Sequence, residues 1–538
     1  MSKGFGAAFS RRSAVCFFVI CCLLFVCYLR VFAITVSDKY SAAAQQQNSY
    51  TLTLSRARGT IYDRNMRTLT NREYKIMAAV SPTPKAVTVI SGMLEGEQLQ
   101  GVLEKLKSGK PAICEVPQSI ECDGIICLEV PVHMSEKQLC AQLIGYTDST
   151  GHGVAGLEKA YDNILYCDED YRISYATNGH GEILPGVQAT KNLTGAVFEN
   201  GVITTLDMNI QQIAENAAKT IKKGAVLISE VGTGNILAMV SRPDFDPLNL
   251  SDALGNSDSP FLNRCLCAYN VGSVFKPCVA AAALENGGVQ GFTHNCTGST
   301  VIDSHTFNCH NRAGHSLMNL KGALTHSCNT FFYNFSVLLG AKSIYSTATT
   351  LGFGNNIELA QGITTSGENM TSLNTVAASE RALANLAIGQ GDLLASPTVL
   401  LNLYSAIAGD GTYTLPSVIH ATLKDGERTL QKRSAPTRVL SEANARLLRE
   451  YLKEVIEVGT GTKAKPVNCT AGGKTATAET GWKNDAGKLV SQSWFCGFFP
   501  FEEPKYVAVV LAEDSVSGGE DCAPVFKKIC EDMTSAGF

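Results

Sequence analysis

The chain has 538 residues, of which 45% are apolar, 17% charged and 8% aromatic. This length and composition exclude an intrinsically disordered chain and suggest about two to four folding units with sizeable cores. The 45 Lys and Arg residues and 49 Asp and Glu residues leave a net charge of −4 without a long run of one sign, so charge indicates no nucleic-acid partner.

An apolar segment near the N-terminus determines the predicted compartment. Residues 13–29 carry no charged side chain, and after Arg30 the apolar run continues to residue 36. Together they nearly match the roughly 20 apolar residues that cross a bilayer, with Arg30 able to reach the headgroups. We therefore predict a single-pass membrane anchor over residues 13–36.

Basic residues set the predicted orientation of this anchor. Lys3, Arg11 and Arg12 precede it, and positive charge next to an apolar span is retained on the cytoplasmic side. We expect residues 1–12 to form a cytoplasmic tail and the chain after residue 36 to lie outside the cytoplasm. A cleaved signal peptide is the alternative interpretation, although its apolar region normally has only about 7–15 residues.

Residues 37–50 are polar and indicate a linker, and residues 51–200 carry mixed, weaker patterns. Two short apolar runs with β character, KIMAAV and AVTVI, occur here beside a helical pattern in MLEGEQLQGVLEKLKSG. We interpret residues 51–200 as an α+β domain.

Residues 201–538 show sharper patterns. A helical segment, NIQQIAENAAKTIKK, precedes two apolar runs, GAVLISE and ILAMVS, which the turn-rich VGTGN joins into a predicted hairpin. Further strand-like runs, SWFCGFFP and YVAVVLAED, lie near the C-terminus, with helical patterns between the two groups. We therefore predict an α/β (α+β) fold whose sheet is built from both ends of this domain and flanked by helices.

Three short motifs in this domain combine residue types that suit serine acyl transfer. They are Ser273-Val-Phe-Lys276, Ser327-Cys-Asn329 and Lys474-Thr-Ala476. Each alone is weak, because Ser273 and Ser327 also suit ordinary helix caps and Lys474 suits a solvated strand. Their conjunction is similar to the signature of penicillin-binding proteins and class A β-lactamases.

The spacing of the first motif has a direct chemical meaning. Ser273 begins a predicted helix, where the positive end of the helix dipole lies, and Lys276 follows one turn later on the same face. A desolvated lysine with a lowered pKa can take the proton of a serine hydroxyl, and a second cation, Lys474, would lower that pKa further. We expect Ser327 to lie in a loop between two helices and Lys474 on an edge strand.

Two further motifs extend the resemblance to one family. Residues 58–65, RGTIYDRN, are similar to the RGxIxDRN motif of class B penicillin-binding proteins, and residues 153–162, GVAGLEKAYD, are similar to their GxxGLExxYD motif. Segments 241–249, 263–264, 314–315 and 388–391 also resemble stretches around that family's active site. The chain is identified as a member of the class B penicillin-binding proteins, which are membrane-anchored D,D-transpeptidases that cross-link peptidoglycan.

The resemblance implies a fold and a division of the chain. It implies a penicillin-binding transpeptidase fold in residues 201–538, with a central, mainly antiparallel sheet flanked by helices. It also implies a non-catalytic pedestal or dimerisation domain in residues 51–200, after the transmembrane helix. The N-terminus would be cytoplasmic and the transpeptidase domain would lie outside the cell membrane.

The resemblance also implies which residues are catalytic. Ser273 would attack the carbonyl carbon of a D-Ala-D-Ala stem peptide to form an acyl-enzyme, and Lys276 would accept its proton. Ser327 would relay a proton to the leaving amine. Lys474 would be the fourth catalytic residue.

Other residues would bind the substrate. Asn329 would hold the amide of the donor peptide, and the hydroxyl groups of Thr475 and Thr477 would bind the terminal carboxylate beside Lys474. The backbone N–H groups of Ser273 and Thr477 would form the oxyanion hole.

The resemblance further implies the partners of the chain. These are the donor stem peptide, the amine acceptor of a second stem peptide, β-lactams that mimic the donor, the membrane, and a polytopic glycosyltransferase that supplies glycan strands. No metal or organic cofactor and no nucleic acid are expected. Whether the chain serves septation, elongation or sporulation stays open.

Two alternatives compete with an active transpeptidase. A catalytically idle scaffold would bind partners through residues 51–200, but it has no reason to retain Ser273 together with Lys276. A β-lactamase would need a carboxylate that activates water, and Glu368 lies too far from Leu373-Asn374 to fit the Glu-x-x-Leu-Asn pattern.

The third motif departs from the family, which usually has Lys-Thr-Gly. The methyl group of Ala476 would lie on the strand facing the substrate, where it either narrows the site beside a bulky β-lactam side chain or changes nothing. We expect acylation by β-lactams to be retained.

Nineteen cysteines are present, and an odd number of them follows the apolar segment. Cys296 and Cys309, with His305, His310 and His315 nearby, superficially suggest a zinc site. Their spacing matches no standard ligand set, and we predict a Cys296–Cys309 disulfide instead.

Overall fold

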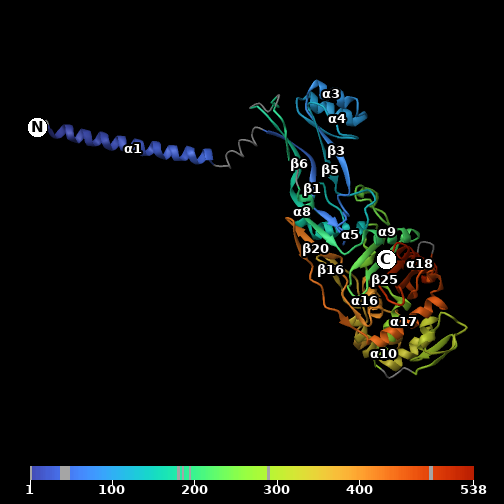
Figure 1. Ribbon diagram of the computed structural model, residues 1–538. Helices are drawn as coiled ribbons and strands as arrows, with labels where there is room; N and C mark the ends of the chain where they lie inside the picture. Colours follow the sequence, from blue (N-terminus) through green and yellow to red (C-terminus); the bar gives the residue numbers. More distant parts are fainter. Residues whose placement is uncertain are drawn as a thin grey trace. The chain divides into compact units, whose positions relative to one another are not determined.

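The computed structural model describes residues 3–36, 49–178, 182–184, 187–192, 195–286, 291–483, 487 and 489–538. Most of the predicted linker, residues 37–50, lies outside these described residues. The chain divides into two compact units (Figure 1). The first comprises Met1–Ala57, Tyr74–Val130 and Glu169–Thr194, and the second comprises Arg58–Glu73, Pro131–Asp168 and Gly195–Phe538.

The two units divide the chain differently from the single boundary predicted at residue 200. Strand β2 (Thr60–Tyr62) pairs in parallel with β8 (Gly201–Thr204), because Thr60 lies opposite Gly201 and Tyr62 opposite Ile203. This pairing brings a segment from before the predicted boundary into the same unit as the C-terminal part of the chain.

Helix α1 (Lys3–Val36) covers the predicted anchor without a break (Figure 1). Its portion Arg12–Thr35 is long and apolar enough to cross a membrane, and none of the side chains there is buried. The helix begins earlier than predicted, within the expected cytoplasmic tail.

The first unit contains two three-stranded sheets. One has the order β1-β6-β7, from Ser49–Arg58, Tyr166–Ala176 and Thr190–Asn192. The other has the order β4-β3-β5, from Ala112–Val116, Glu73–Val80 and Ile125–Val132. Helices α3 (Pro84–Ser91) and α4 (Gly96–Lys107) bury apolar side chains in one core with the second sheet.

The β character predicted for AVTVI is wrong, since these residues lie in α3. The hydroxyl of Thr83 caps this helix by accepting a hydrogen bond from the Ala86 N–H at 3.3 Å, and Pro84 occupies the first turn. An N-cap followed by proline favours a helix start strongly enough to override the strand preference of β-branched residues.

The second unit is built on an antiparallel five-stranded sheet with the order β10-β9-β25-β24-β23. Its strands are Ile236–Arg242, Gly224–Glu230, Tyr506–Ala512, Leu489–Phe499 and Gly472–Lys483 in that order. The predicted hairpin is β9 and β10, and the two C-terminal runs are β24 and β25. The sheet is therefore built from both ends of the domain, as predicted.

Helices cover both faces of this sheet. On one face, α9 (Met208–Ala217) and α18 (Ala523–Ser535) share a core with side chains such as Val226 and Val510. On the other face, α10 (Lys276–Asn286), α16 (Pro397–Ala408) and α17 (Glu442–Glu457) bury side chains against residues such as Leu227 and Val509. Because both faces are buried, the strands are apolar along most of their length.

Further helices of this unit lie between strands β10 and β23 in the sequence. The further helices are α11 (Leu320–Thr325), α12 (Asn329–Leu339), α13 (Ala341–Thr350), α14 (Leu373–Ala378) and α15 (Glu380–Ala387). Shorter helical turns include α5 (Ala141–Ile144), α6 (Gly156–Ala160), α7 (Asp162–Leu165), α8 (Ala196–Glu199), η1 (Ala218–Thr220), η2 (Leu250–Asp252), η3 (Arg264–Leu266), η4 (Gly272–Phe275), η5 (Thr462–Ala464) and η6 (Gly518–Cys522).

Small sheets complete the second unit. Strands β20 (Ile419–Lys424) and β21 (Glu427–Leu430) extend the pair formed by β2 and β8. The two-stranded sheets pair β11 (Tyr269–Asn270) with β18 (Leu394–Ala395), β12 (His294–Cys296) with β15 (Ser316–Met318), β13 (Ser299–Ile302) with β14 (His305–Asn308), β16 (Glu358–Ala360) with β17 (Ile363–Thr364), and β19 (Thr412–Tyr413) with β22 (Thr437–Arg438).

Candidate active site

Ser273 lies in the short helical turn η4, directly before α10 begins at Lys276. It is half-buried, whereas Gly272, Val274 and Phe275 of the same turn are fully buried. The buried hydroxyl of Tyr404 donates a hydrogen bond to the carbonyl oxygen of Val274 at 3.1 Å. The turn is thus anchored on its buried side and leaves the serine accessible.

Two glycines allow the backbone to approach closely at this turn. The N–H of Gly272 donates to the carbonyl oxygen of Gly389 at 2.8 Å, and both residues have positive φ angles, 64° and 72°. A Cβ on Gly389 would lie 2.1 Å from the carbonyl oxygen of Gly272, so a side chain does not fit there. The segment 388–391, singled out by resemblance, therefore supports the turn that holds Ser273.

Lys276 is a fully buried amine held by the second motif. Its Nζ atom donates hydrogen bonds to the carbonyl oxygen of Ser327 at 2.8 Å, to Ser327 Oγ at 3.1 Å and to Asn329 Oδ1 at 2.6 Å. Burial lowers the pKa of Lys276 to about 7, against the opposing influence of the Cys328 and Cys309 thiols. The amine can therefore be neutral near neutral pH.

The loop that carries Ser327 and Asn329 lies between α11 and α12, as predicted. Ser327 has a φ of 54°, in the left-handed region that residues with a side chain rarely adopt. The N–H of Cys328 donates to the carbonyl oxygen of Ala323 at 2.9 Å and fixes the loop against α11. This backbone directs both oxygens of Ser327 and the amide oxygen of Asn329 toward Lys276.

The third motif lies on β23, the edge strand of the central sheet, also as predicted. Lys474 is fully buried, and its Nζ donates to the carbonyl oxygen of Thr475 at 3.0 Å. Burial, with a smaller contribution from the charge of Lys276, lowers the pKa of Lys474 well below its ordinary value. This electrostatic coupling indicates that the two lysines lie near each other.

The threonines of β23 alternate with residues that pack against the Ser273 turn. Thr477 is exposed, and its Oγ1 accepts a hydrogen bond from the Gly518 N–H at 3.2 Å. Thr475 Oγ1 lies 2.8 Å from Thr460 Oγ1. A Cβ on Gly272 would lie 3.4 Å from the Cβ of Ala476. The strand therefore contacts the turn directly.

Ala476 is not placed as the sequence analysis expected. Its side chain is only 4% exposed and points toward Gly272. The methyl group is buried against the turn and does not offer a surface to a substrate. Of the two interpretations left open, the structure favours the one in which the methyl group changes nothing in substrate binding.

The two motifs outside the trio meet in the second unit. Arg58 Nε pairs with Glu158 Oε2, Arg58 NH1 lies 2.9 Å from Asp162 Oδ1, and His133 Nε2 lies 2.8 Å from Glu158 Oε1. Burial alone would raise the pKa of Glu158, but His133 and Arg58 together lower it. Arg58 and Glu158 are 5% and 0% exposed, so the two motifs are joined by a buried ion pair.

Segments 241–249 and 263–264 support the approach to the Ser273 turn. Ser241 Oγ accepts a hydrogen bond from the Arg264 N–H at 3.1 Å. The Arg264 side chain pairs with Glu513 Oε1 at 2.6 Å, and the Tyr269 hydroxyl donates to the same oxygen at 2.9 Å. These contacts tie the chain before Ser273 to the end of β25.

Glu368, considered for a β-lactamase, is engaged at the start of α16. Its carboxylate oxygens accept hydrogen bonds from the Ser396 N–H at 3.2 and 3.1 Å. Burial raises the pKa of Glu368 to about 7. Ser396 is the N-cap of α16, so the carboxylate supports a helix end.

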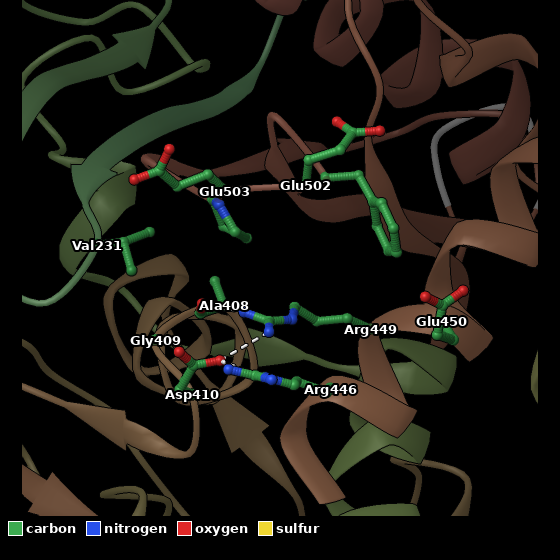
Figure 2. A pocket seen from close by; sticks show the side chains of 11 residues that line it. Val231, Ala408, Gly409, Asp410, Arg446, Arg449, Glu450, Glu502 and Glu503 are labelled. Carbon is green, nitrogen blue, oxygen red and sulfur yellow. Dashed lines mark hydrogen bonds and ion pairs between the residues drawn. The ribbon is translucent and has the colours of Figure 1, made fainter. Parts of the chain in front are cut away.

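A pocket of about 630 Å³ lies among α16, α17 and the turn between β24 and β25. Figure 2 shows Arg446 and Arg449 directed toward Asp410, and Arg449 NH2 lies 2.7 Å from Asp410 Oδ1. Glu502 and Glu503 line the same pocket. None of the residues of the three sequence motifs lines this pocket. The pocket is therefore separate from the candidate active site, which we place at the motifs.

The cysteines are all free thiols in the structure, and the predicted Cys296–Cys309 disulfide is not formed. Both thiols lie instead in a group with His315 and Cys328 that could hold a metal ion. Cys328 could not be predicted as a ligand from the sequence, because it occupies the variable position of the Ser-x-Asn motif.

Comparisons with known proteins identify relatives of the chain. The family described as "Penicillin binding protein transpeptidase domain" matches residues 224–531. Stage V sporulation protein D of Bacillus subtilis is 27% identical, over 92% of this chain and 81% of that protein. Peptidoglycan D,D-transpeptidase MrdA of Acinetobacter baumannii is 25% identical, over 93% of this chain and 84% of that protein.

A solved structure is similar in fold. The crystal structure of penicillin-binding protein 3 from Mycobacterium tuberculosis, complexed with aztreonam, matches with a TM-score of 0.64 and 23% sequence identity. The match covers 90% of this chain and 97% of that chain.

Proposed function

Because the chain belongs to the penicillin-binding protein transpeptidase family, we propose that it cross-links peptidoglycan stem peptides as a serine-type D,D-transpeptidase. One observation carries the assignment of its active site. A fully buried lysine, Lys276, follows Ser273 by one helical turn and bridges Ser327 and Asn329. The first and second sequence motifs both contribute to this arrangement.

The first half of the reaction forms the acyl-enzyme. Ser273 Oγ attacks the carbonyl carbon of the penultimate D-Ala, and its proton passes to the neutral amine of Lys276. The carbonyl oxygen becomes an oxyanion, which the backbone N–H groups of Ser273 and Thr477 stabilise. The C–N bond then breaks, and Ser327 relays a proton to the departing amine of the terminal D-Ala.

The second half transfers the acyl group to a second stem peptide. The acceptor amine attacks the ester carbonyl carbon and gives up a proton to Lys276, the bond to Ser273 Oγ breaks, and Lys276 returns that proton to the serine oxygen. The lowered pKa of Lys276, about 7, supports this role, because the amine can both accept and release a proton near neutral pH.

The substrate would be held by residues of the second and third motifs. Lys474 would attract the terminal carboxylate of the donor peptide, with Thr475 and Thr477 as hydrogen-bond donors. Asn329 would bind the donor amide. A β-lactam would enter the same site as a mimic of the donor and acylate Ser273.

The N-terminal helix would anchor the enzyme at the membrane. The length and composition of Arg12–Thr35 support a single membrane pass. We propose that the N-terminus is cytoplasmic and that the transpeptidase domain lies outside, where peptidoglycan is assembled. We also propose that a polytopic glycosyltransferase supplies the glycan strands that this chain cross-links.

A peptide cross-linking assay tests the proposed activity. The purified full-length chain in detergent is incubated with a D-Ala-D-Ala stem peptide and an amine acceptor, and products are identified by mass spectrometry. We expect release of D-Ala and a cross-linked peptide, both abolished by penicillin and in Ser273→Ala. A folded chain that gives no product would support a scaffold, and rapid turnover of penicillin would support a β-lactamase.

A further inference from the structure

We propose that Cys296, Cys309, His315 and Cys328 bind one zinc ion next to the active-site loop. Their potential ligand atoms, three thiol sulfurs and one imidazole nitrogen, all lie within 4.8 Å of one another. The four residues come from separate elements of the second unit: β12, the segment after β14, the segment before β15, and the N-cap of α12. The fold therefore gathers four potential ligands at one point.

The spacing of the four atoms fits tetrahedral zinc. The His315 Nδ1 atom lies 3.6 Å from the sulfur of Cys296 and 3.6 Å from the sulfur of Cys309. With Zn–S near 2.3 Å and Zn–N near 2.0–2.1 Å, a tetrahedral centre places sulfur and nitrogen about 3.6 Å apart. The two distances at His315 therefore match a tetrahedral site, and all four potential ligand atoms lie within 4.8 Å of one another.

The chemistry of the four ligands selects the metal. Three thiolates and one imidazole are soft and borderline donors, which favour zinc over the oxygen-loving magnesium and calcium. Four protein ligands leave no open position for a reacting water, so the site would be structural. Zinc binding would release the remaining thiol protons to solvent.

The surroundings suit bound thiolates. The three cysteines are buried, at 2%, 1% and 0% exposure for Cys296, Cys309 and Cys328. His310 Nδ1 lies 3.8 Å from the sulfur of Cys309, and Thr330 Oγ1 lies 3.4 Å from that of Cys328. These groups can donate hydrogen bonds that stabilise the negative charge of the sulfurs.

Cys328 connects the proposed metal to the active site. It lies between Ser327 and Asn329, whose oxygens accept all three hydrogen bonds of the Lys276 amine. Zinc would hold this loop by its central residue and fix it to the segments at Cys296 and His315. This positioning step rests on the proposed transpeptidase function, whereas zinc binding itself does not.

A disulfide between Cys309 and Cys328 is the main competing state of the cluster. Their sulfur atoms lie within 4.8 Å of each other, so oxidation could join them. Such a bond would remove two ligands and prevent zinc binding. Metal content and thiol state together therefore decide between the two states.

Metal analysis of the full-length chain tests the site. The chain is purified in detergent without added metal, and zinc is measured by elemental mass spectrometry. We expect one zinc per chain in wild type and in the control Cys122→Ser, whose cysteine lies outside the cluster. We expect at least about a tenfold loss of bound zinc in Cys296→Ser and His315→Ala after dialysis against a weak chelator.

Two measurements on wild-type protein avoid dependence on the folding of the variants. Cobalt(II) added to the zinc-free chain should give the visible absorption of tetrahedral cobalt with thiolate ligands. Modification of the thiols should release one equivalent of zinc to a coloured chelator. Absence of zinc and of the cobalt spectrum, or a Cys309–Cys328 disulfide in freshly isolated protein, would overturn the site.

The proposed effect of zinc on the position of the Ser327–Asn329 loop is tested by a separate measurement. Removal of zinc should lower the rate of penicillin acylation about tenfold, and added zinc should restore it. One bound zinc with an acylation rate that does not respond to its removal would overturn the positioning step. A chain that binds zinc but is never acylated would instead contradict the proposed function and leave the metal site intact.

Discussion

Lys276 combines deep burial with three hydrogen-bond acceptors from one loop. Burial disfavours the charged amine, while the acceptors hold it in a single position. The nearby charged or titratable groups are Lys474, Cys328 and Cys309, and only Lys474 repels the charge on Lys276. The result is an amine whose protonation changes near neutral pH.

This environment predicts how penicillin acylation depends on pH. The neutral form of Lys276 is the base, and its pKa is about 7, so the acylation rate constant should fall as the pH drops below 7. Lys276→Arg should lower the rate constant by about 10²–10⁴-fold, because a guanidinium stays protonated. Stopped-flow acylation with a fluorescent penicillin measures both effects. An acylation rate constant that stays the same from about pH 5 to about pH 9, two units on either side of the pKa of Lys276, would contradict the role of Lys276 as the base.

The residues of the trio could be predicted from sequence because each motif keeps its chemistry within three positions. Ser273, Ser327 and Lys474 all lie in the kind of element that was expected for them. The contribution of Cys328 could not be predicted, because its partners Cys296 and His315 approach it only through the packing of separate hairpins. Proximity along the chain pointed to Cys296, Cys309 and His315 but carried no signal for Cys328.

At the scale of elements, the edge strand β23 and the turn η4 depend on small side chains where they meet. Ala476 and Ala478 both face Gly272, and a Cβ there would lie 3.4 and 3.2 Å from theirs. Both alanines are buried. Their methyl groups fill the contact between the strand and the turn.

This contact predicts the effect of restoring the usual glycine in the third motif. Ala476→Gly should lower the free energy of unfolding by about 1–2 kcal/mol, from the lost methyl burial and the added backbone freedom. The acylation rate should stay unchanged, since the methyl group does not line the site. Ala478→Gly is the matched control, with a similar loss of stability. Faster acylation of bulky β-lactams by Ala476→Gly alone would show that the methyl group does contact the substrate.

The buried pair between Arg58 and Glu158 joins two segments that are distant in sequence. Both side chains are almost fully buried, and each has further polar partners. Without Glu158, the buried guanidinium of Arg58 would keep only the partly exposed Asp162 as an acidic partner, so its charge would be poorly compensated in the interior. The pair therefore contributes to the assembly of the second unit.

Glu158→Ala should destabilise the chain far more than loss of an exposed pair. We expect the free energy of unfolding to fall by about 3–5 kcal/mol. The control Asp532→Ala breaks the exposed pair with Lys528 and should cost less than about 1 kcal/mol. Urea denaturation followed by intrinsic fluorescence compares the two variants. Equal losses would mean that Asp162 alone compensates the charge of Arg58.

Most elements of the second unit could be predicted because their patterns are long and periodic. The predicted strands correspond to β9, β10, β24 and β25, and the edge position of β23 was also expected. The first unit was harder, as α3 shows, because a cap and a proline outweigh the four β-branched residues of the AVTVI run. The capping residue and the proline at a helix start determine whether such a short segment forms a helix.

At the scale of the whole molecule, one apolar helix accompanies two compact units. The sequence could predict the helix from composition alone. It could not predict that Arg58–Glu73 and Pro131–Asp168 belong with the C-terminal part, because pairing of β2 with β8 joins residues that are far apart in sequence. Contacts of that kind appear only when the chain is folded.

The proposed orientation predicts the behaviour of fusions at the C-terminus. Alkaline phosphatase fused after Phe538 should be active in cells, and green fluorescent protein fused at the same position should be dark when exported by the general secretion route. Reversing the charges of Lys3, Arg11 and Arg12 should reduce the phosphatase activity, because these residues keep the N-terminus inside. A fluorescent, phosphatase-negative pair of fusions would contradict the orientation.

The central claim is that Ser273 is the residue that becomes acylated. The full-length chain is treated with penicillin in detergent, digested with protease and analysed by peptide mass spectrometry. We expect one penicilloyl group, located on Ser273, and no adduct on Ser273→Ala. An adduct on another residue, or equal labelling of Ser273→Ala and wild type, would contradict it.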